Sequence, residues 1–354
     1  EFRKVRLLSR ILISKGSHPM SSPISFQAIR IFEEDGKFEQ HIVERSTVDL
    51  PEGEVLIQVH YSSLNYKDAL SASGNRGVTR NYPHTPGVDA SGIVAASTDP
   101  DFQAGDSVIV TSYDLGMNTD GGFGEYIRVP AAWVLRLPEE LTLQEAMIYG
   151  TAGFTAAKSF WELKMAGCKP ENGPILVTGA AGGVGSISVR LLLNSGYEVA
   201  AVSGHDHGKA LLKELGVQQI LGREEAIDTG TRPLLKSKWN GVIDSVGGLP
   251  LATALKATQP GGVITTCGNI AGAELSTTVF PFILRGLRLI GIDSQNCPHA
   301  LRKQLWQHLA SDWKLQNLKV GLKEVAIEGM LNEIESILRS EVKGRVVLRH
   351  EAAA

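Results

Sequence analysis

Cysteine is scarce in this sequence, and the few cysteines present are widely separated. The chain of 354 residues contains three, at positions 168, 267 and 297. Three scattered cysteines do not make a disulfide framework, and their presence as free thiols is typical of a reducing compartment. We therefore expect a cytoplasmic protein that folds without disulfides.

Strong charge and long apolar runs are also missing. The formal net charge is -3, which gives no reason to expect nucleic acid or an anionic membrane as a partner. No apolar run is long enough to cross a bilayer. The remaining composition, 43% hydrophobic and 21% charged, is ordinary for a soluble globular protein with a sizeable core. The length favours two domains over one.

The two ends of the chain differ from the rest. Residues 1–19 carry five basic side chains against one acidic side chain and precede Met20. We interpret them as an added leader outside the fold, with a basic organellar presequence as the alternative. The last residues, 351–354, are interpreted as a tail.

The most informative stretch runs from Gly173 to Ser203. An apolar, β-branched run at Ile175–Thr178 predicts a buried strand, and a glycine-rich turn follows at Gly179–Gly185. A helical pattern then covers Ile187–Leu193, and a second strand is predicted at Val199–Val202. Glycines at such a turn let the backbone approach a pyrophosphate at a helix N-terminus. The full G-x-G-x-x-G pattern is broken by Ala180, but the strand and helix around it favour a dinucleotide site over an ordinary tight turn.

The end of the second strand indicates which dinucleotide binds. An NAD site usually carries an acidic residue there, to bond the ribose 2′-hydroxyl. Ser203 occupies that position, with His205 and Lys209 nearby. A small hydroxyl with basic neighbours suits a 2′-phosphate, so we favour NADPH. Asp206 is the argument against this preference, and Lys209 could equally be an ordinary surface lysine.

Short strands dominate the first part of the chain, and alternating strands and helices the second. Residues 24–138 predict antiparallel strands, whereas the region after Leu143 predicts a long helix and then a parallel sheet. Amphipathic helices are expected at Pro298–Trp313 and Glu324–Leu338. A last strand at Gly344–Arg349 is expected to return to the first domain. We predict a first domain at 20–145 and 300–354 and a nucleotide-binding domain at 146–299.

These features together resemble a known family. The motifs that carry the resemblance are Leu64–Asp68, Pro86–Gly92, Gly105–Val108, Gly150–Thr155, Ala181–Gly185 and Gly344–Arg345. The chain is similar over residues 24–349 to the medium-chain dehydrogenase/reductase superfamily, in its zinc-independent quinone oxidoreductase branch. Within that branch, Asn65–Asp68, Val202–Gly204, Pro281–Arg285 and Gly291–Ser294 resemble the bacterial acrylyl-CoA reductases. The resemblance implies an α/β fold, with a GroES-like antiparallel β-barrel domain and a Rossmann domain with a doubly wound parallel sheet.

The resemblance also implies that no metal is bound. Zinc enzymes of this superfamily place a Cys and a Gly-His-Glu motif where this chain has Asn65–Lys67 and Gly87–Asp89. Three cysteines are too few for the superfamily's structural site of four. The remaining histidines show no ligand spacing. We interpret Asp89 and Asp106 as structural residues that bond nearby backbone at glycine turns.

Without a metal, the implied chemistry is hydride transfer to an activated carbon–carbon double bond. Asn65 is the candidate to hold the nicotinamide and the substrate carbonyl, Tyr66 is the candidate donor to the developing enolate, and Lys67 assists. Solvent could supply the proton instead. The alternative interpretation of Asn65 and Tyr66 is a strand-end turn with a packed tyrosine.

Cofactor contacts are carried over from the resemblance residue by residue. The glycine turn supplies Ala181, Gly182, Gly183 and Val184 for the pyrophosphate, and Ser203, Gly204, His205 and Lys209 serve the 2′-phosphate. Relatives often carry Arg at the position of His205, which leaves the strength of the NADPH preference open. The implied contacts toward the nicotinamide are Tyr66, Asn269, Ile283, Ser294 and Arg345, and Thr151 and Thr155 are implied for the nicotinamide or the phosphates.

Three functions remain open at this point. The first is an NADPH-dependent reductase of an enoyl thioester such as acrylyl-CoA, with Lys67, Arg76 and Arg80 as candidates for the CoA phosphates. The second is a reductase of quinones or small enones, and the third is an NADPH-binding protein without activity. The predicted strand Leu287–Asp293 would be a sheet edge, and relatives cover this edge with a second copy. We therefore expect a homodimer.

Overall fold

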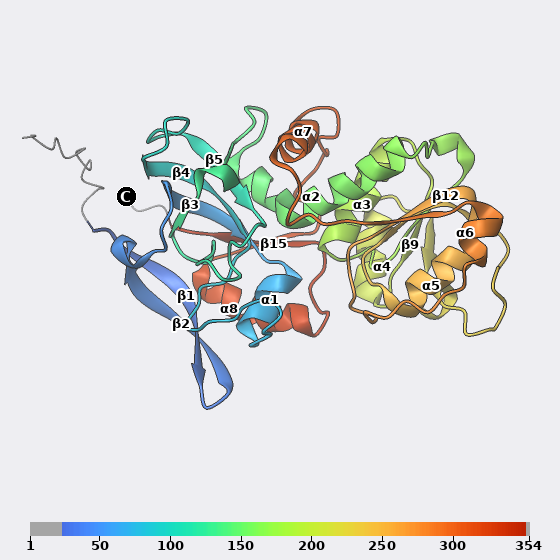
Figure 1. Ribbon diagram of the computed structural model, residues 1–354, viewed down its shortest axis with the longest axis horizontal. Helices are drawn as coiled ribbons and strands as arrows, with labels where there is room; N and C mark the ends of the chain where they lie inside the picture. Colours follow the sequence, from blue (N-terminus) through green and yellow to red (C-terminus); the bar gives the residue numbers. More distant parts are fainter. Residues whose placement is uncertain (1–22, 352–354) are drawn as a thin grey trace, which may run out of the picture.

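The computed structural model describes residues 23–351 and contains two large sheets at opposite ends of an elongated molecule (Figure 1). The leader predicted at 1–19 lies outside the described residues. A separate antiparallel hairpin is formed by β1 (Ser25–Glu34) and β2 (Lys37–Ser46). In the described part of the chain, no helix combines the length and apolar character needed to span a membrane.

The first sheet has seven strands, most of them antiparallel. Its strands are β3 (Val55–Ser63), β4 (Asp89–Ser97), β5 (Ser107–Thr111), β6 (Tyr126–Val129), β7 (Leu135–Arg136), β14 (Leu322–Val325) and β15 (Arg345–Arg349). The predicted last strand, β15, pairs antiparallel with β3, so the end of the chain returns to the first sheet. The β14–β15 pair is parallel, which the sequence pattern did not indicate.

The second sheet has six strands in the order β10-β9-β8-β11-β12-β13. All its pairings are parallel, and the strands are β8 (Ile175–Val177), β9 (Val199–Val202), β10 (Gln219–Leu221), β11 (Trp239–Asp244), β12 (Thr258–Thr266) and β13 (Arg288–Gly291). The order reverses at β8, as in a doubly wound sheet, and β13 is an edge strand as expected. The predicted α/β fold with a GroES-like and a Rossmann-like part is therefore confirmed.

Eight α-helices occur in the described chain. They are α1 (Tyr66–Ala72), α2 (Leu143–Met165), α3 (Gly183–Asn194), α4 (Asp206–Glu214), α5 (Gly248–Ala257), α6 (Phe280–Arg285), α7 (His299–Ala310) and α8 (Ile327–Leu338). Single 3-10 turns occur at Thr47–Asp49, Ala131–Trp133, Pro170–Asn172 and Glu224–Ala226. The last predicted helix was too long by three residues at its start, because Glu324 and Val325 belong to β14. A four-residue strand is too short for its alternation to stand out beside a helix.

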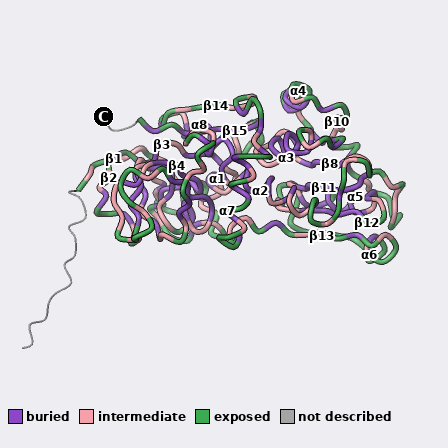
Figure 2. Tube along the Cα trace, turned by 90° about the horizontal axis from the view of Figure 1, so that it is seen from above, coloured by how far each residue is buried: buried purple, intermediate pink, exposed green. Residues whose placement is uncertain are grey.

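Helix α2 connects the two sheets. Thr142 caps its N-terminus, and the side chain of Glu145 bonds back to the Thr142 N–H. Its backbone leaves the helical conformation at Gly150 (φ 51°, ψ -156°) and then resumes. Most of the helix is buried, and it packs on α3 and on strands of both sheets. The buried residues of the two ends are visible as purple segments in Figure 2, with α2 between them.

Candidate active site

One cavity of about 1120 Å³ joins the two parts of the molecule. Its walls include Asn65–Lys67 from the first part and the glycine turn Gly179–Gly185 from the second. Ligand pockets usually have volumes of about 300–1,000 Å³, so this cavity has room for more than one small ligand. The Asn65 turn and the glycine turn, which are far apart in the sequence, therefore belong to a single site.

The glycine turn forms a cradle at the start of α3. Gly182 is the N-cap of α3 and has no side chain to satisfy the first N–H groups of the helix. A Cβ at Gly185 would lie 2.2 Å from the carbonyl oxygen of Gly179, so only glycine permits this close turn. Ala181, Gly182, Gly183 and Val184 all line the cavity. Free N–H groups at a helix N-terminus fit a pyrophosphate.

Ser203, Gly204 and His205 line the far end of the same cavity, at the end of β9. Arg223, from the loop after β10, places its Nη2 2.9 Å from Nε2 of His205. A Cβ at Gly204 would lie 2.3 Å from Nε of Arg223, so the glycine lets the guanidinium approach. The His205 and His207 rings stack with centroids 5.2 Å apart. This end of the cavity therefore gathers the basic groups that a phosphate requires.

Arg223 is the residue that sequence reasoning missed. It follows a three-residue strand, Gln219–Leu221, that was not recognised as part of the sheet. In a parallel sheet the carboxyl ends of neighbouring strands meet at one edge, so the loop after β10 lies beside the end of β9. The available signal was an arginine shortly after the apolar pair Ile220 and Leu221.

Asn65 to Lys67 lie at the junction of β3 and α1. Asn65 is the N-cap of α1, and its backbone N–H donates to Oδ2 of Asp68 at 2.7 Å. Tyr66 and Lys67 are half-buried and line the cavity. Nζ of Lys67 donates to Oε1 of Gln295, 2.8 Å away, in the segment after β13. Burial lowers the pKa of Lys67, against the opposite effects of Asp293 and Asp68.

Asp68 ties this turn to the glycine turn that precedes β4. Its carboxylate is fully buried and also accepts the N–H groups of Gly87 and Val88, at 3.1 and 2.8 Å. Burial, with a smaller contribution from Asp89, raises the pKa of Asp68 to about 7. The backbone hydrogen bonds act in the opposite direction and are outweighed.

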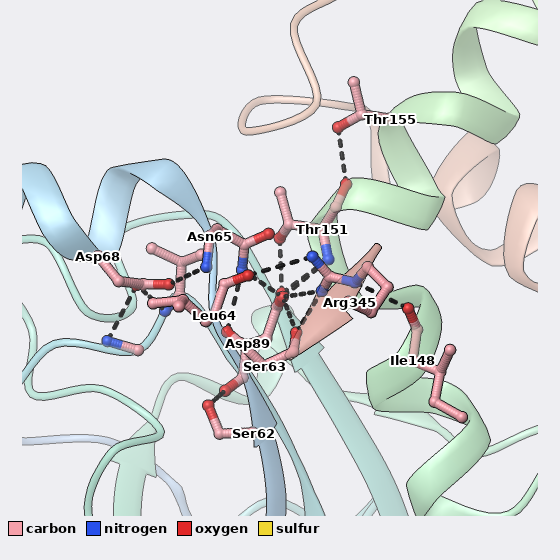
Figure 3. A network of polar contacts seen from close by, with 12 residues as sticks. Ser62, Ser63, Leu64, Asn65, Asp68, Asp89, Ile148, Thr151, Thr155 and Arg345 are labelled. Atoms are coloured by element: carbon pink, nitrogen blue, oxygen red, sulfur yellow. Dashed lines mark hydrogen bonds and ion pairs between the residues drawn. The ribbon is translucent and has the colours of Figure 1, made fainter. Parts of the chain in front are cut away.

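Beneath the turn lies a buried network centred on Asp89 (Figure 3). The Asp89 carboxylate accepts hydrogen bonds from Ser63 Oγ (2.6 Å), Asn65 Nδ2 (2.7 Å) and Thr151 Oγ1 (2.6 Å). Nη2 of Arg345 lies 4.0 Å from Oδ2 of Asp89. The same guanidinium donates hydrogen bonds to Ser63 Oγ and to the carbonyl oxygens of Ile148 and Leu64. Asp89 is therefore structural, as expected, but its partners come from distant segments. Asp106, by contrast, accepts the nearby N–H of Gln103 at 2.9 Å.

The predicted cofactor residues do not all lie on the cavity wall. Asn269 and Arg345 line it with the residues already described. Five others are not among its lining residues: Thr151, Thr155, Lys209, Ile283 and Ser294. The Thr151 hydroxyl is held by Asp89, and that of Thr155 donates to the carbonyl oxygen of Thr151. Ile283 is 66% exposed on α6. The roles of these five residues stay predictions.

Both arginines considered for the CoA phosphates also lie away from the cavity wall. Arg76 pairs with Glu33 and its guanidinium lies over the ring of Tyr82, and neither Arg76 nor Arg80 lines the cavity. Among the residues considered for the CoA phosphates, only Lys67 faces it. The substrate end of the cavity therefore has little positive charge.

The donor set at the turn does not suit zinc. Between residues 23 and 351, no group of three or more His, Cys, Asp or Glu side chains converges as metal ligands would. The oxygens of Asp89 are already used by hydrogen-bond donors, and the nitrogen of Asn65 faces them. The absence of a bound metal in the protein stays a prediction.

Comparison with known proteins identifies two family models. Residues 51–139 match "Alcohol dehydrogenase GroES-like domain" and residues 183–311 match "Zinc-binding dehydrogenase". The chain is 44% identical over 325 residues to "Putative quinone oxidoreductase YhfP" of Bacillus subtilis (strain 168), covering 92% of this chain and 98% of that one. It is 41% identical over 316 residues to "Acrylyl-CoA reductase AcuI" of Ruegeria pomeroyi, covering 89% and 96%.

Solved structures of similar proteins contain nicotinamide cofactors. The yhdH oxidoreductase of Salmonella enterica, solved with NADP, superposes with a TM-score of 0.89 at 41% identity, covering 92% of this chain and 100% of that one. The Bacillus subtilis protein yhfP, solved with NAD, also superposes with a TM-score of 0.89, at 43% identity, covering 92% and 99%.

Proposed function

The chain belongs to the medium-chain dehydrogenase/reductase superfamily and is an NADPH-dependent oxidoreductase, and on that premise we propose that it reduces the carbon–carbon double bond of an α,β-unsaturated thioester. The observation that carries the proposal is the shared cavity, in which the glycine cradle and the Asn65–Lys67 turn face the same space. When bound, the nicotinamide supplies the hydride.

The cofactor's two ends have separate binding groups. The N-terminus of α3 holds the pyrophosphate. Ser203, His205 and Arg223 hold the 2′-phosphate, and the contact between Arg223 and His205 supports this assignment. Asn269 and Arg345 line the cavity toward the nicotinamide end.

Tyr66 and Lys67 serve the substrate. Reduction at the β-carbon places negative charge on the carbonyl oxygen, which needs hydrogen-bond donors. Tyr66 and Lys67 line the cavity at this turn, and their hydroxyl and ammonium groups are hydrogen-bond donors. The lowered pKa of Lys67 makes its ammonium a better proton donor near neutral pH.

A quinone or small enone is the second candidate substrate. It is favoured by the shortage of cations at the substrate end, where Lys67 is the one basic candidate on the wall and Arg76 and Arg80 are elsewhere. A CoA thioester would need to leave its phosphates outside the described cavity. The name of the Ruegeria pomeroyi relative supports the thioester, and the name of the Bacillus subtilis relative supports the quinone.

We also propose a cytoplasmic homodimer with a small-molecule substrate and without nucleic acid or membrane partners. All three cysteines are free, as in reducing compartments. In the described chain β13 leaves one edge of the parallel sheet unpaired, and Val279, which caps α6, and Ile283 and Leu284 within α6 are each more than 60% exposed. A second copy would cover both features.

Turnover of acryloyl-CoA and of a simple quinone, each with NADPH and with NADH, tests the proposal. We expect faster reduction of acryloyl-CoA, a preference for NADPH, and a loss of about 100-fold in kcat for Tyr66→Phe. Tyr61→Phe is the matched control, because Tyr61 is half-buried on β3 and lies outside the cavity lining. Faster turnover of the quinone would favour the second candidate, and no turnover of either would leave a cofactor-binding protein without activity.

A further inference from the structure

The side-chain nitrogen of Asn65 faces two groups that can only accept hydrogen bonds. Nδ2 lies 2.7 Å from Oδ2 of Asp89 and 3.1 Å from the carbonyl oxygen of Ser63. The amide oxygen could not replace the nitrogen there, because a carbonyl oxygen has no hydrogen to donate and the carboxylate is surrounded by donors. The orientation of this amide is thus defined by its partners, and both its N–H groups are used inside the protein (Figure 3).

Asp89 is itself held independently of Asn65. Helix α2 is interrupted at Gly150, and a new helical segment begins after it. The N–H of Thr151 lies in the first turn of that segment and therefore needs an acceptor outside the helix. It lies 2.9 Å from both oxygens of Asp89. The Thr151 hydroxyl and Ser63 Oγ add two more donors, and Asp89 is fully buried. The helix that crosses between the two sheets therefore determines where this carboxylate lies.

Only the oxygen of Asn65 remains available to a ligand. It takes part in the capping box at the start of α1 with Asp68, and an amide oxygen has two lone pairs. Asn65 lines the cavity, so a bound molecule meets an acceptor at this position.

We propose that Asp89 is a positioning residue that turns Asn65 so that it presents its oxygen to the cavity, and that Asn65 therefore recognises a hydrogen-bond donor. On the proposed function, on which this inference rests, the donor is the carboxamide NH₂ of the nicotinamide. The carbonyl or enolate oxygen of the substrate cannot be the partner, because Asn65 has no N–H left to donate. This separates the two roles that the sequence assigned to Asn65 together.

Binding of two oxidised cofactors tests the inference. NADP⁺ carries the carboxamide, whereas its 3-acetylpyridine analogue has a methyl group in place of the NH₂. By calorimetry we expect the unmodified protein to bind NADP⁺ about tenfold or more tightly than the analogue, as for loss of one partner of a desolvated hydrogen bond. The ratio of the two affinities is insensitive to the fraction of protein that is folded.

The ratio should fall to near one in Asp89→Asn, where the new amide lets Asn65 turn, and equally in Asn65→Ala. Ser62→Ala is the matched control, since Ser62 is buried on β3 and donates to the backbone oxygen of Asp89 at 2.6 Å without touching its carboxylate. It should keep the ratio of the unmodified protein.

Three results would overturn the inference: a ratio near one in the unmodified protein, an unchanged ratio in Asp89→Asn, or an unchanged ratio in Asn65→Ala. The last variant decides the matter if Asp89→Asn does not fold. Failure of NADP⁺ to bind at all would overturn the proposed function as well. Tight NADP⁺ binding with a ratio of one would overturn this inference alone.

Discussion

Replacement of Arg223 by glutamine should weaken NADPH binding and leave NADH binding unchanged. The guanidinium lies at the Ser203 end of the cavity, where its Nη2 contacts His205. A hydrogen bond to a charged group contributes about 1.5–3 kcal/mol, and the lower figure applies here because Arg223 is exposed to solvent. A loss of about 1.5 kcal/mol corresponds to an increase of about tenfold in Kd. NADH has no 2′-phosphate and should lose nothing.

The assay is fluorescence titration of both reduced cofactors at low and at high salt. Because the interaction is between charges at a solvent-exposed position, the difference between the two proteins should shrink as salt is raised. Lys213→Gln is the control, since it removes one exposed positive charge from α4 and does not line the cavity. Equal weakening of NADPH and NADH by Arg223→Gln, or no weakening of NADPH, would refute the assignment of Arg223 to the phosphate.

Three further predictions concern stability. Burial lowers the pKa of His350 from 6.5 to about 4, so its contribution to stability is complete above pH 6.5 and is lost as the pH falls toward 4, with about 2 kcal/mol lost by pH 5. Urea unfolding at pH 7.5 and 5 should show this loss in the unmodified protein and not in His350→Gln. Burial raises the pKa of Asp68 from 3.8 to about 7, so its effect on stability has the opposite pH dependence. The stability that this group contributes is complete below about pH 4 and falls as the pH rises through 7, by an amount on the order of 4 kcal/mol. Asp68→Asn should therefore flatten the dependence of the unfolding free energy on pH between pH 5 and 8. Gly150→Ala should lower the Tm by several degrees, because Gly150 has a φ of 51° and a Cβ there would lie 2.4 Å from Asp89 Oδ2. The control is Gly167→Ala, which is also at positive φ but has open space around it, and which should cost only the backbone strain of about 1–2 kcal/mol. Equal losses of stability at the two glycines would contradict the role of the Asp89 network.

Local sequence patterns were sufficient for the central strands of the parallel sheet and for the glycine turn after β8. These elements lie within twenty residues of one another: the strand Ile175–Val177, the glycines after it and the helix Gly183–Asn194. The strand follows from its β-branched content, the turn from the conformational freedom of glycine, and the helix from its periodicity. The same is true of Ser203, whose position at the end of β9 follows from its distance along one βαβ unit. The short strands β10 and β14 were missed, because three or four residues carry too little periodicity.

The amino-acid sequence by itself determined the class of the protein and predicted the glycine turn and the Asn65–Lys67 turn as parts of its site, since each depends on residues close together in the chain. Only the tertiary structure decided which groups act together. Arg223 reaches His205 because two parallel strands end at one sheet edge. Asp89 holds Asn65 because β3, β4, the kink of α2 and the start of β15 meet in one buried place, where each unpaired polar atom must find a partner. Such convergence depends on packing between distant segments, which no local pattern encodes.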